Sequence, residues 1–168
     1  LLSLPSITHQ TKRGNMRFLL ITVSFFVFVQ LLHAQTVNPD YDSTLAKKFG
    51  ADDYGMKSYV FVILKTGSNT TTDKAFIDSC FAGHMANIFR LVDEGKLIVA
   101  GPFGKNDNSY RGLFIFNVST IEEAKKLVET DPAINSKLLD ADLYNWYGSA
   151  ALPEYLEAAL KIGKYKIN

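Results

Sequence analysis

The chain has 168 residues, of which 47% are hydrophobic and 21% are charged, and its formal net charge is +1. That length suits one domain, and the apolar content excludes a chain that is disordered along most of its length. The near-neutral charge gives no reason to expect a nucleic-acid partner, because phosphate binding requires a basic excess on one face. A single cysteine excludes an internal disulfide and a cysteine-rich zinc site.

Residues 16–34 have the organisation of a secretory signal peptide. Met16 and a basic residue precede the apolar run 18–29, and the small residue Ala34 precedes a polar stretch. A basic start, an apolar stretch of about 7–15 residues and a small residue before the cut define such a signal. The run is shorter than the roughly 20 apolar residues of a spanning helix, so an uncleaved anchor is the weaker interpretation. We expect cleavage after Ala34, export to the periplasm or the medium, and no stable membrane anchor on the mature protein.

Residues 1–15 contain no methionine, and we interpret them as sequence upstream of the natural start. Three of the 18 basic residues and none of the 17 acidic residues lie before residue 35, so residues 35–168 carry 15 basic and 17 acidic groups. The mature chain of 134 residues is therefore mildly acidic and long enough for a single core.

The first half of the mature chain predicts an extension, a strand and a helix. Residues 35–56 are polar and aspartate-rich, which favours an N-terminal extension with one helical turn. The β-branched and aromatic run 58–65 predicts the first strand, and a loop rich in Gly, Ser, Asn and Thr follows over 66–73. Residues 74–94 predict an amphipathic helix that Gly95 ends. The apolar residues at helical spacing are Ile77, Phe81, Met85, Ile88 and Val92.

A hairpin is predicted next. Residues 96–100 form a short strand closed by Gly101 and Pro102, and a Gly/Asn/Asp turn over 103–109 leads to a third strand over 110–118. We expect the third strand to pair with the second.

The remaining elements are a helix, a turn, a strand and a tail helix. Ser119 and Glu122 fit a capping box that opens a helix through Thr130. Asp131 and Pro132 break that helix and can cap a following turn, because proline suits the first helical position. A fourth strand over 142–147 and a C-terminal helix over 152–162 complete the chain.

The order β-α-β-β-α-β plus a tail helix predicts an α+β, ferredoxin-like fold, with helices on one face of an antiparallel sheet. The first and third strands are apolar on both faces. Two helices cover only one face, so the other face needs a second copy of the chain or the tail helix. We favour a homodimer packed through the sheet face.

His84 is the one histidine of the mature chain. This excludes a metal site built from several histidines of one chain, and no paired acidic spacing suggests a carboxylate site. Gly101 and Gly104 lack the strand–turn–helix context of a phosphate loop. The sequence therefore predicts neither a metal nor a cofactor.

His84 lies on the predicted first helix with the apolar residues that face the sheet. Such a histidine is more often a core residue than a catalyst, although an imidazole that titrates near neutral pH also serves as a general acid or base. Cys80 lies one turn earlier on the same face, so a Cys-His nucleophilic pair is a further, weaker hypothesis. Asp131 by itself fits an N-cap. In the predicted topology its segment lies beside the first helix, where its carboxylate can reach His84 and orient the imidazole.

Two stretches closely resemble the YciI-like (YCII-related) domain. The first runs from His84 through a Gly-Lys-Leu turn to Ala-Gly-Pro at 100–102. The second comprises Gly-Leu-Phe-Ile-Phe at 112–116, Ser-x-x-Glu-Glu-Ala at 119–124 and Asp131-Pro132, with an aromatic stretch at 144–147 that fits the last strand. The resemblance covers about residues 57–150 and leaves residues 151–168 as a C-terminal helix and tail.

The resemblance implies a ferredoxin-like domain that dimerises as an α/β barrel, with a His84–Asp131 pair in its active site. Some members of the family resemble lyases of chlorinated-aromatic breakdown. The export signal, the N-terminal extension and the tail helix depart from the usual form of the family, so a substrate cannot be carried over.

The sequence is compatible with two functions. The first is a cofactor-independent lyase or isomerase that moves a proton on a small organic substrate with His84 and Asp131. The second is a dimeric, non-catalytic module for a small ligand, in which the pair is structural. The residues expected to line the pocket are Cys80, Gly101, Pro102, Tyr110, Tyr144 and Trp146. Access of solvent to His84 distinguishes the two functions, because a catalyst must reach a cavity.

Overall fold

The computed structural model describes residues 38–164, and the fold considered below begins at Asp42. The segments interpreted as an upstream stretch and a signal peptide, residues 1–34, lie outside the described residues. In the part of the chain that the structure describes, every helix is too short or too polar to cross a bilayer.

Four strands form one antiparallel sheet. The strands are β1 (Met56–Thr66), β2 (Leu97–Pro102), β3 (Tyr110–Phe116) and β4 (Leu139–Ser149). Their order in the sheet is β2-β3-β1-β4, so the first strand lies at the centre between the third and the fourth. With one helix after β1 and another after β3, this is the predicted ferredoxin-like α+β fold.

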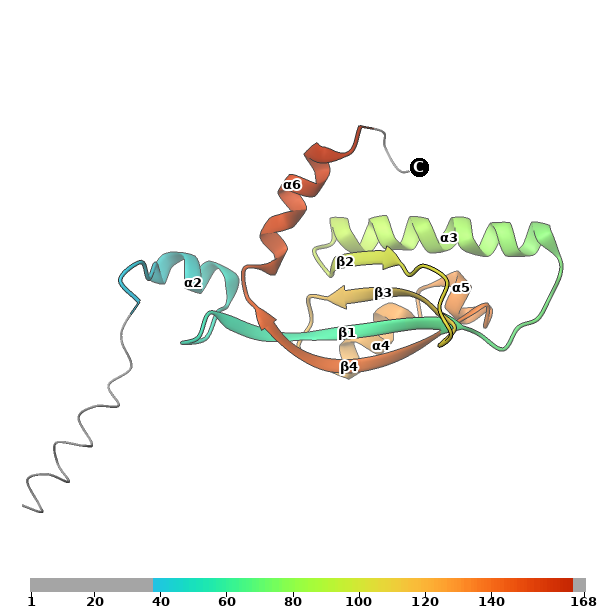
Figure 1. Cartoon of the computed structure of the whole chain (residues 1–168), viewed down its shortest axis with the longest axis horizontal. Coiled ribbons are helices and arrows are strands. Elements are labelled where there is room, and N and C mark those ends of the chain that lie inside the picture. Colours follow the sequence, from blue (N-terminus) through green and yellow to red (C-terminus); the bar gives the residue numbers. More distant parts are fainter. Residues whose placement is uncertain (1–37, 165–168) are drawn as a thin grey trace, which may run out of the picture. The chain divides into compact units, whose positions relative to one another are not determined.

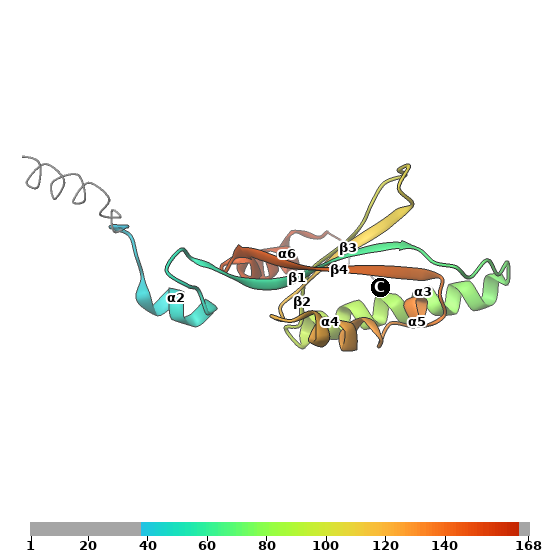
Figure 2. The ribbon, with the colours of Figure 1, turned by 90° about the horizontal axis from the view of Figure 1, so that it is seen from below.

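Three of the helices pack on one side of this sheet. The described helices are α2 (Ser43–Phe49), α3 (Lys74–Asp93), α4 (Ile121–Val128), α5 (Pro132–Asn135), the 3-10 turn η2 (Leu152–Glu154) and α6 (Tyr155–Ile162). Figures 1 and 2 show α3, α4 and α5 together on one face of the sheet.

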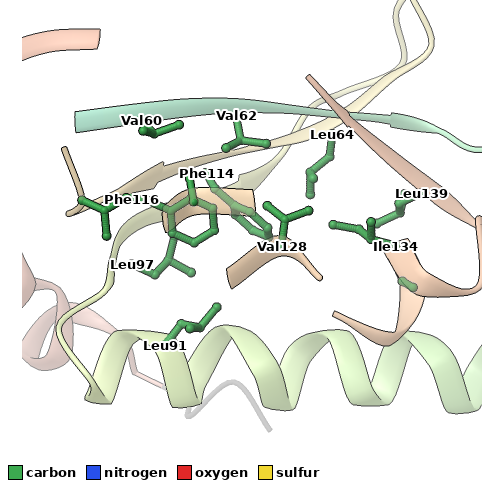
Figure 3. Close-up of a cluster of buried hydrophobic side chains, with 13 residues drawn as sticks. Val60, Val62, Leu64, Leu91, Leu97, Phe114, Phe116, Val128, Ile134 and Leu139 are labelled. Atoms are coloured by element: carbon green, nitrogen blue, oxygen red, sulfur yellow. The ribbon is translucent and has the colours of Figure 1, made fainter. Parts of the chain in front are cut away.

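The core lies between that face and the helices. Alternate residues of a strand point to opposite faces. Val60, Val62 and Leu64 of β1 point toward α3, where Leu91 meets them (Figure 3). These side chains are at most 3% exposed, so burial of their apolar surface stabilises the layer of helices on the sheet.

Polar caps set where the helices begin. Asp73 accepts a hydrogen bond from the Phe76 amide and starts α3. The α4 cap is Thr120, which accepts from the amide of Glu123, so the predicted capping box of Ser119 and Glu122 is shifted by one residue. Asp131 caps α5 with Pro132 at its first position, as predicted.

β4 and the N-terminal helix exceed most clearly what the sequence indicates, and β1 also extends beyond 58–65 at both ends. β4 extends beyond 142–147 at both ends because it pairs with β1 along the whole of Met56–Thr66. Backbone pairing thus continues through polar residues that carry no strand signal. The N-terminal extension contains α2, a helix of seven residues, where one turn was expected.

The face of the sheet opposite α3 carries a second apolar surface. Phe61, Ile63, Leu113 and Ile115 are half-buried there and pair across β1 and β3. The tail helix does not bury itself on this surface: α6 has no buried residue and its Leu160 is 84% exposed.

Candidate active site

His84 and Asp131 form a side-chain pair between α3 and α5. His84 Nδ1 lies 2.7 Å from Asp131 Oδ2, and the two side chains are 12% and 1% exposed. His84 belongs to the face of α3 that carries the buried residues Cys80, Asn87 and Leu91. The fold therefore brings together two residues 47 positions apart.

Asp131 serves as a helix cap and as the partner of His84 at the same time. Its Oδ1 accepts hydrogen bonds from the amides of Ala133 (2.9 Å) and Ile134 (3.4 Å), which leaves Oδ2 for the imidazole. A carboxylate held in this way at the start of a helix cannot rotate freely. Both interpretations of Asp131 that the sequence offered are thus realised in one residue.

Aromatic rings enclose the imidazole on two sides. The Phe114 ring is stacked on it with 5.9 Å between ring centroids, and the Phe81 ring meets it edge-on at 6.1 Å. Since ionised Asp131 can only accept, Nδ1 carries the proton in the neutral ring and Nε2 keeps its lone pair. No fully enclosed side-chain nitrogen or oxygen among the described residues lacks a partner, and no described residue bonds Nε2, so Nε2 is not fully enclosed in a side chain that is 12% exposed.

A close helix contact supports the pair. A β-carbon built on Gly83 would lie 2.8 Å from Pro132 Cγ. The absence of a side chain at residue 83 therefore lets α5 approach α3 beside His84. The sequence signal was a glycine inside an amphipathic helix, which often marks a packing contact.

The predicted pocket residues near β2 and β3 lie on the strands that adjoin the imidazole. Pro102 pairs with Gly112 at the end of β2, and Gly101 pairs with Leu113. Phe114, which stacks on His84, follows Leu113 in β3. Tyr110 begins β3 four residues before Phe114, which is about 13 Å along the strand.

The structure does not bring Tyr144 and Trp146 to His84. Tyr144 pairs with Phe61 and Trp146 with Tyr59, which places both on the face opposite α3. There the Trp146 ring packs over Tyr59, with 5.5 Å between ring centroids. The expected pocket of His84 with these two aromatic residues is therefore corrected for a single chain, because the sheet lies between them.

Three polar residues beside the pair were missed by the sequence analysis. Asn87 lies in α3 and is 7% exposed. Its Oδ1 accepts from Arg90 Nη2 at 2.7 Å and lies 2.9 Å from Thr130 Oγ1. The available signal was an amide three residues after His84, on the apolar face of the predicted helix.

The described residues contain no group of three or more His, Cys, Asp or Glu side chains placed to hold a metal ion. The site consists of one imidazole, one carboxylate and surrounding apolar rings. Such a set can move a proton, orient a polar ligand or hold the helices together.

No family model matches the chain, and no curated protein sequence matches it. Among solved structures, the chain is similar to 5-chloro-2-hydroxyhydroquinone dehydrochlorinase from Burkholderia phenoliruptrix AC1100 in complex with 2,5-dihydroxybenzoquinone. The two are 23% identical, with a TM-score of 0.38, over 52% of this chain and 92% of that chain. The fold assignment rests on the strand order and pairing described above.

Proposed function

We propose that this chain is a cofactor-independent acid–base enzyme that moves a proton on a small organic substrate through His84 and Asp131. One observation carries the proposal: Asp131 fixes Nδ1 of His84, while Nε2 has no hydrogen-bond partner among the described residues and is not fully enclosed. A residue that acted only as a strut would gain nothing from such a second nitrogen. The resemblance to YciI-like domains supports the same assignment of the pair.

The chemistry follows from the tautomer. With its Nδ1–H donated to Asp131, the neutral ring presents the Nε2 lone pair as a base. When Nε2 takes a proton from the substrate, the imidazolium is stabilised by the carboxylate 2.7 Å away. Return of that proton to another atom of the substrate completes an isomerisation. In an elimination, the bond to the leaving group breaks, the leaving group departs as an anion with the bonding electrons, and Nε2 then releases its proton to solvent.

The surroundings favour a flat, apolar substrate. Phe81 and Phe114 lie against the imidazole; Phe114 is only 3% exposed, so a ring bound at the site gains its offset or edge-on aromatic contacts from the imidazole and the half-buried Phe81. A phenol or an aromatic ketone has both an acidic proton and such a ring, so we assign the substrate to this class.

Exchange of substrate protons with solvent tests the proposal before the full reaction is known. A panel of phenols and aromatic ketones is incubated with the protein in D2O, and loss of ring or α-carbon proton signals is followed by NMR. We expect exchange of at least one compound to fall about 100-fold or more in His84→Ala. Asp78→Ala is the control on the same helix, where the Asp78 side chain is 61% exposed, and it retains exchange. If no compound exchanges faster with the wild-type protein than with His84→Ala, the acid–base function is wrong.

The second candidate is a dimeric small-ligand-binding module with a structural His-Asp pair. Its support is the burial of Asp131, which is 1% exposed and already caps α5. In the same NMR samples, a binding module would shift signals of Phe114 and its neighbours on addition of a compound without any exchange into it.

We also propose a homodimer through the sheet face opposite α3. The half-buried residues Phe61, Ile63, Leu113 and Ile115 form a contiguous apolar surface across two paired strands. Contiguous apolar surface of this kind marks an interface. Packing of two copies through this face also brings Tyr144 and Trp146 of each copy to the interface, because both residues lie on this face of the sheet.

Export remains a proposal based on residues 16–34. Expression of the full chain in a bacterial host, followed by fractionation and N-terminal sequencing, tests it. A mature N-terminus at Gln35 in the periplasm or medium is expected, and a full-length chain in the cytosol contradicts it.

A further inference from the structure

The described residues include only two buried side chains that are charged or carry an amide, and they lie at one contact. These are Asn87 and Asp131, which are 7% and 1% exposed. Burying a polar group costs free energy unless it is hydrogen-bonded. Two such groups between α3 and the turn that leads to α5 indicate a contact that is specified by hydrogen bonds.

A guanidinium joins the polar groups around Asn87. Arg90 Nη2 donates to Asn87 Oδ1 at 2.7 Å and to Thr130 Oγ1 at 3.0 Å, while Nη1 donates to Glu94 Oε1 at 2.7 Å. The single hydroxyl proton of Thr130 has two acceptors in range, Asn87 Oδ1 at 2.9 Å and Leu127 O at 2.6 Å. With either choice, Arg90 bridges α3 to Thr130.

Three consecutive residues where the turn leads into α5, residues 130–132, each contact α3. Thr130 meets Asn87, Asp131 meets His84, and Pro132 meets Gly83. Residues 84 and 87 lie on one face of a helix, one turn apart. A displacement of Thr130 along α3 therefore displaces the Asp131 carboxylate relative to the imidazole.

The cap of α5 cannot supply this alignment. The amides of Ala133 and Ile134 fix the carboxylate of Asp131 within its own segment. They do not determine where that segment lies against α3. The Gly83–Pro132 contact limits how near the segment comes to α3. The contacts of Asn87 and Arg90 with Thr130 tie the segment to one position along α3.

We infer that Asn87, Arg90 and Thr130 are positioning residues, which hold the turn before α5 so that Asp131 meets Nδ1 of His84. The inference rests on the proposed function of the pair and adds the residues that align it. None of the three touches the reacting atoms.

The test reads the His84 ring directly. In the full-length protein labelled with 15N on histidine, the ring signals of His84 are identified by their loss in His84→Ala. At pH 8.5 we expect the wild-type ring in the Nδ1–H form, with a low-field Nδ1 proton that exchanges slowly with water. In Thr130→Val that proton exchanges about fivefold faster or more, the factor that corresponds to one lost hydrogen bond, and the ring shifts toward a mixture of tautomers.

Matched variants separate positioning from general loss of stability. Thr120→Val removes the cap of α4 but touches neither Asn87 nor Arg90, so its ring signals stay as in the wild type. Thr130→Ser keeps the hydroxyl and restores the slow exchange. Arg90→Met is the second variant: the Arg90 side chain is 45% exposed, so the fold is retained, and a methionine keeps the apolar stem but has no donor for Asn87 and Thr130.

The outcomes distinguish two failures. If the wild-type ring lacks the bonded Nδ1 proton, the His84–Asp131 pair and the proposed function are wrong. If the wild-type ring has the bonded Nδ1 proton and neither Thr130→Val nor Arg90→Met changes it, the pair stands and the positioning role is overturned.

Discussion

Gly83 lies against Pro132 so closely that a β-carbon on residue 83 would come 2.8 Å from Pro132 Cγ. A proline ring cannot swing aside as the end of a long side chain can. This contact determines how near α5 lies to α3, and hence whether the adjacent residues His84 and Asp131 meet.

We expect Gly83→Ala to destabilise the protein although alanine is the better helix former. The propensity gain is about 1 kcal/mol, and overpacking costs typically about 1–3 kcal/mol. Urea unfolding measures the balance, with Gly104→Ala as the control because a β-carbon at residue 104 meets nothing within 4 Å. A Gly83→Ala protein more stable than the wild type would show that the contact does not constrain the helices.

Replacement of Asp131 separates its two roles. Asp131→Asn keeps an oxygen for the α5 amides, whereas Asp131→Ala removes the cap and leaves the Nδ1 proton of His84 unpaired. We expect Asp131→Ala to cost roughly 2–4 kcal/mol, the sum of a lost cap and an unpaired buried group, and Asp131→Asn clearly less. Both variants should lose the exchange of substrate protons with D2O that His84 is proposed to catalyse. Equal stability losses in urea unfolding would contradict the double role.

The Nε2 nitrogen of His84, which is not fully enclosed, should react. Diethyl pyrocarbonate modifies accessible imidazole nitrogens, and mass spectrometry of peptides locates the adduct. We expect an adduct on the peptide that contains His84 in the native protein. An adduct that appears only after denaturation would show that the imidazole is enclosed, and would favour the structural interpretation.

A second ionisable pair gives the protein a pH dependence away from the site. The Tyr147 hydroxyl donates to the Asp52 carboxylate, and this hydrogen bond, with those from the amides of Met56 and Tyr54, holds the pKa of Asp52 below its ordinary value. The same bond raises the pKa of Tyr147. Asp52 lies in the turn that precedes β1, so the pair attaches this turn to the end of β4.

The lowered pKa of Asp52 and the raised pKa of Tyr147 make the stability of the folded protein depend on pH. A depressed carboxyl pKa stabilises the folded state above the unfolded pKa of about 4, and that contribution disappears as the pH falls through the folded pKa. The raised Tyr147 pKa stabilises below about pH 10 and the contribution disappears above it. We expect Tyr147→Phe to be less stable than the wild type at pH 7 and to converge with it in acid. In a carboxyl 13C titration the pKa of Asp52 should rise in this variant, and an unchanged value would contradict the assignment.

The apolar sheet face predicts the oligomeric state. Ile115→Lys places a charge at its centre, and we expect light scattering to give the mass of a monomer where the wild type gives that of a dimer. Leu160→Ser on α6 is the control, since Leu160 lies outside this face and is 84% exposed. A wild-type protein that is monomeric at high concentration would contradict the proposed homodimer.

Apolar runs and helical periodicity were sufficient to predict the strand and helix order, and thus the fold. The continuous β-branched and aromatic run of β1 and the helical period of residues 74–94 each reflect burial, which is the strongest signal that a sequence carries. Element ends were less predictable, since β4 continues through Asp140 because β1 offers backbone partners there, whatever the side chains.

The site was predictable in part for a related reason. His84 and Asp131 could be paired because a helix and a capped turn both pack on the same face of the sheet. Tyr144 and Trp146 were assigned to that pocket from their residue types alone, and strand register places them on the other face. Asn87 carries only a weak signal, an amide on the apolar face of the predicted helix, and its partner Thr130 carries none, because a single hydrogen bond across a helix contact depends on tertiary positions.

The ring spectrum of His84 in the wild type and in Asp131→Asn tests the central claim most directly. At pH 8.5 we expect a protonated Nδ1 and an unprotonated Nε2 in the wild type, and a mixture of tautomers in Asp131→Asn. A wild-type ring protonated at Nε2, or one that ignores the Asp131 substitution, would contradict the claim that Asp131 orients His84 for proton transfer.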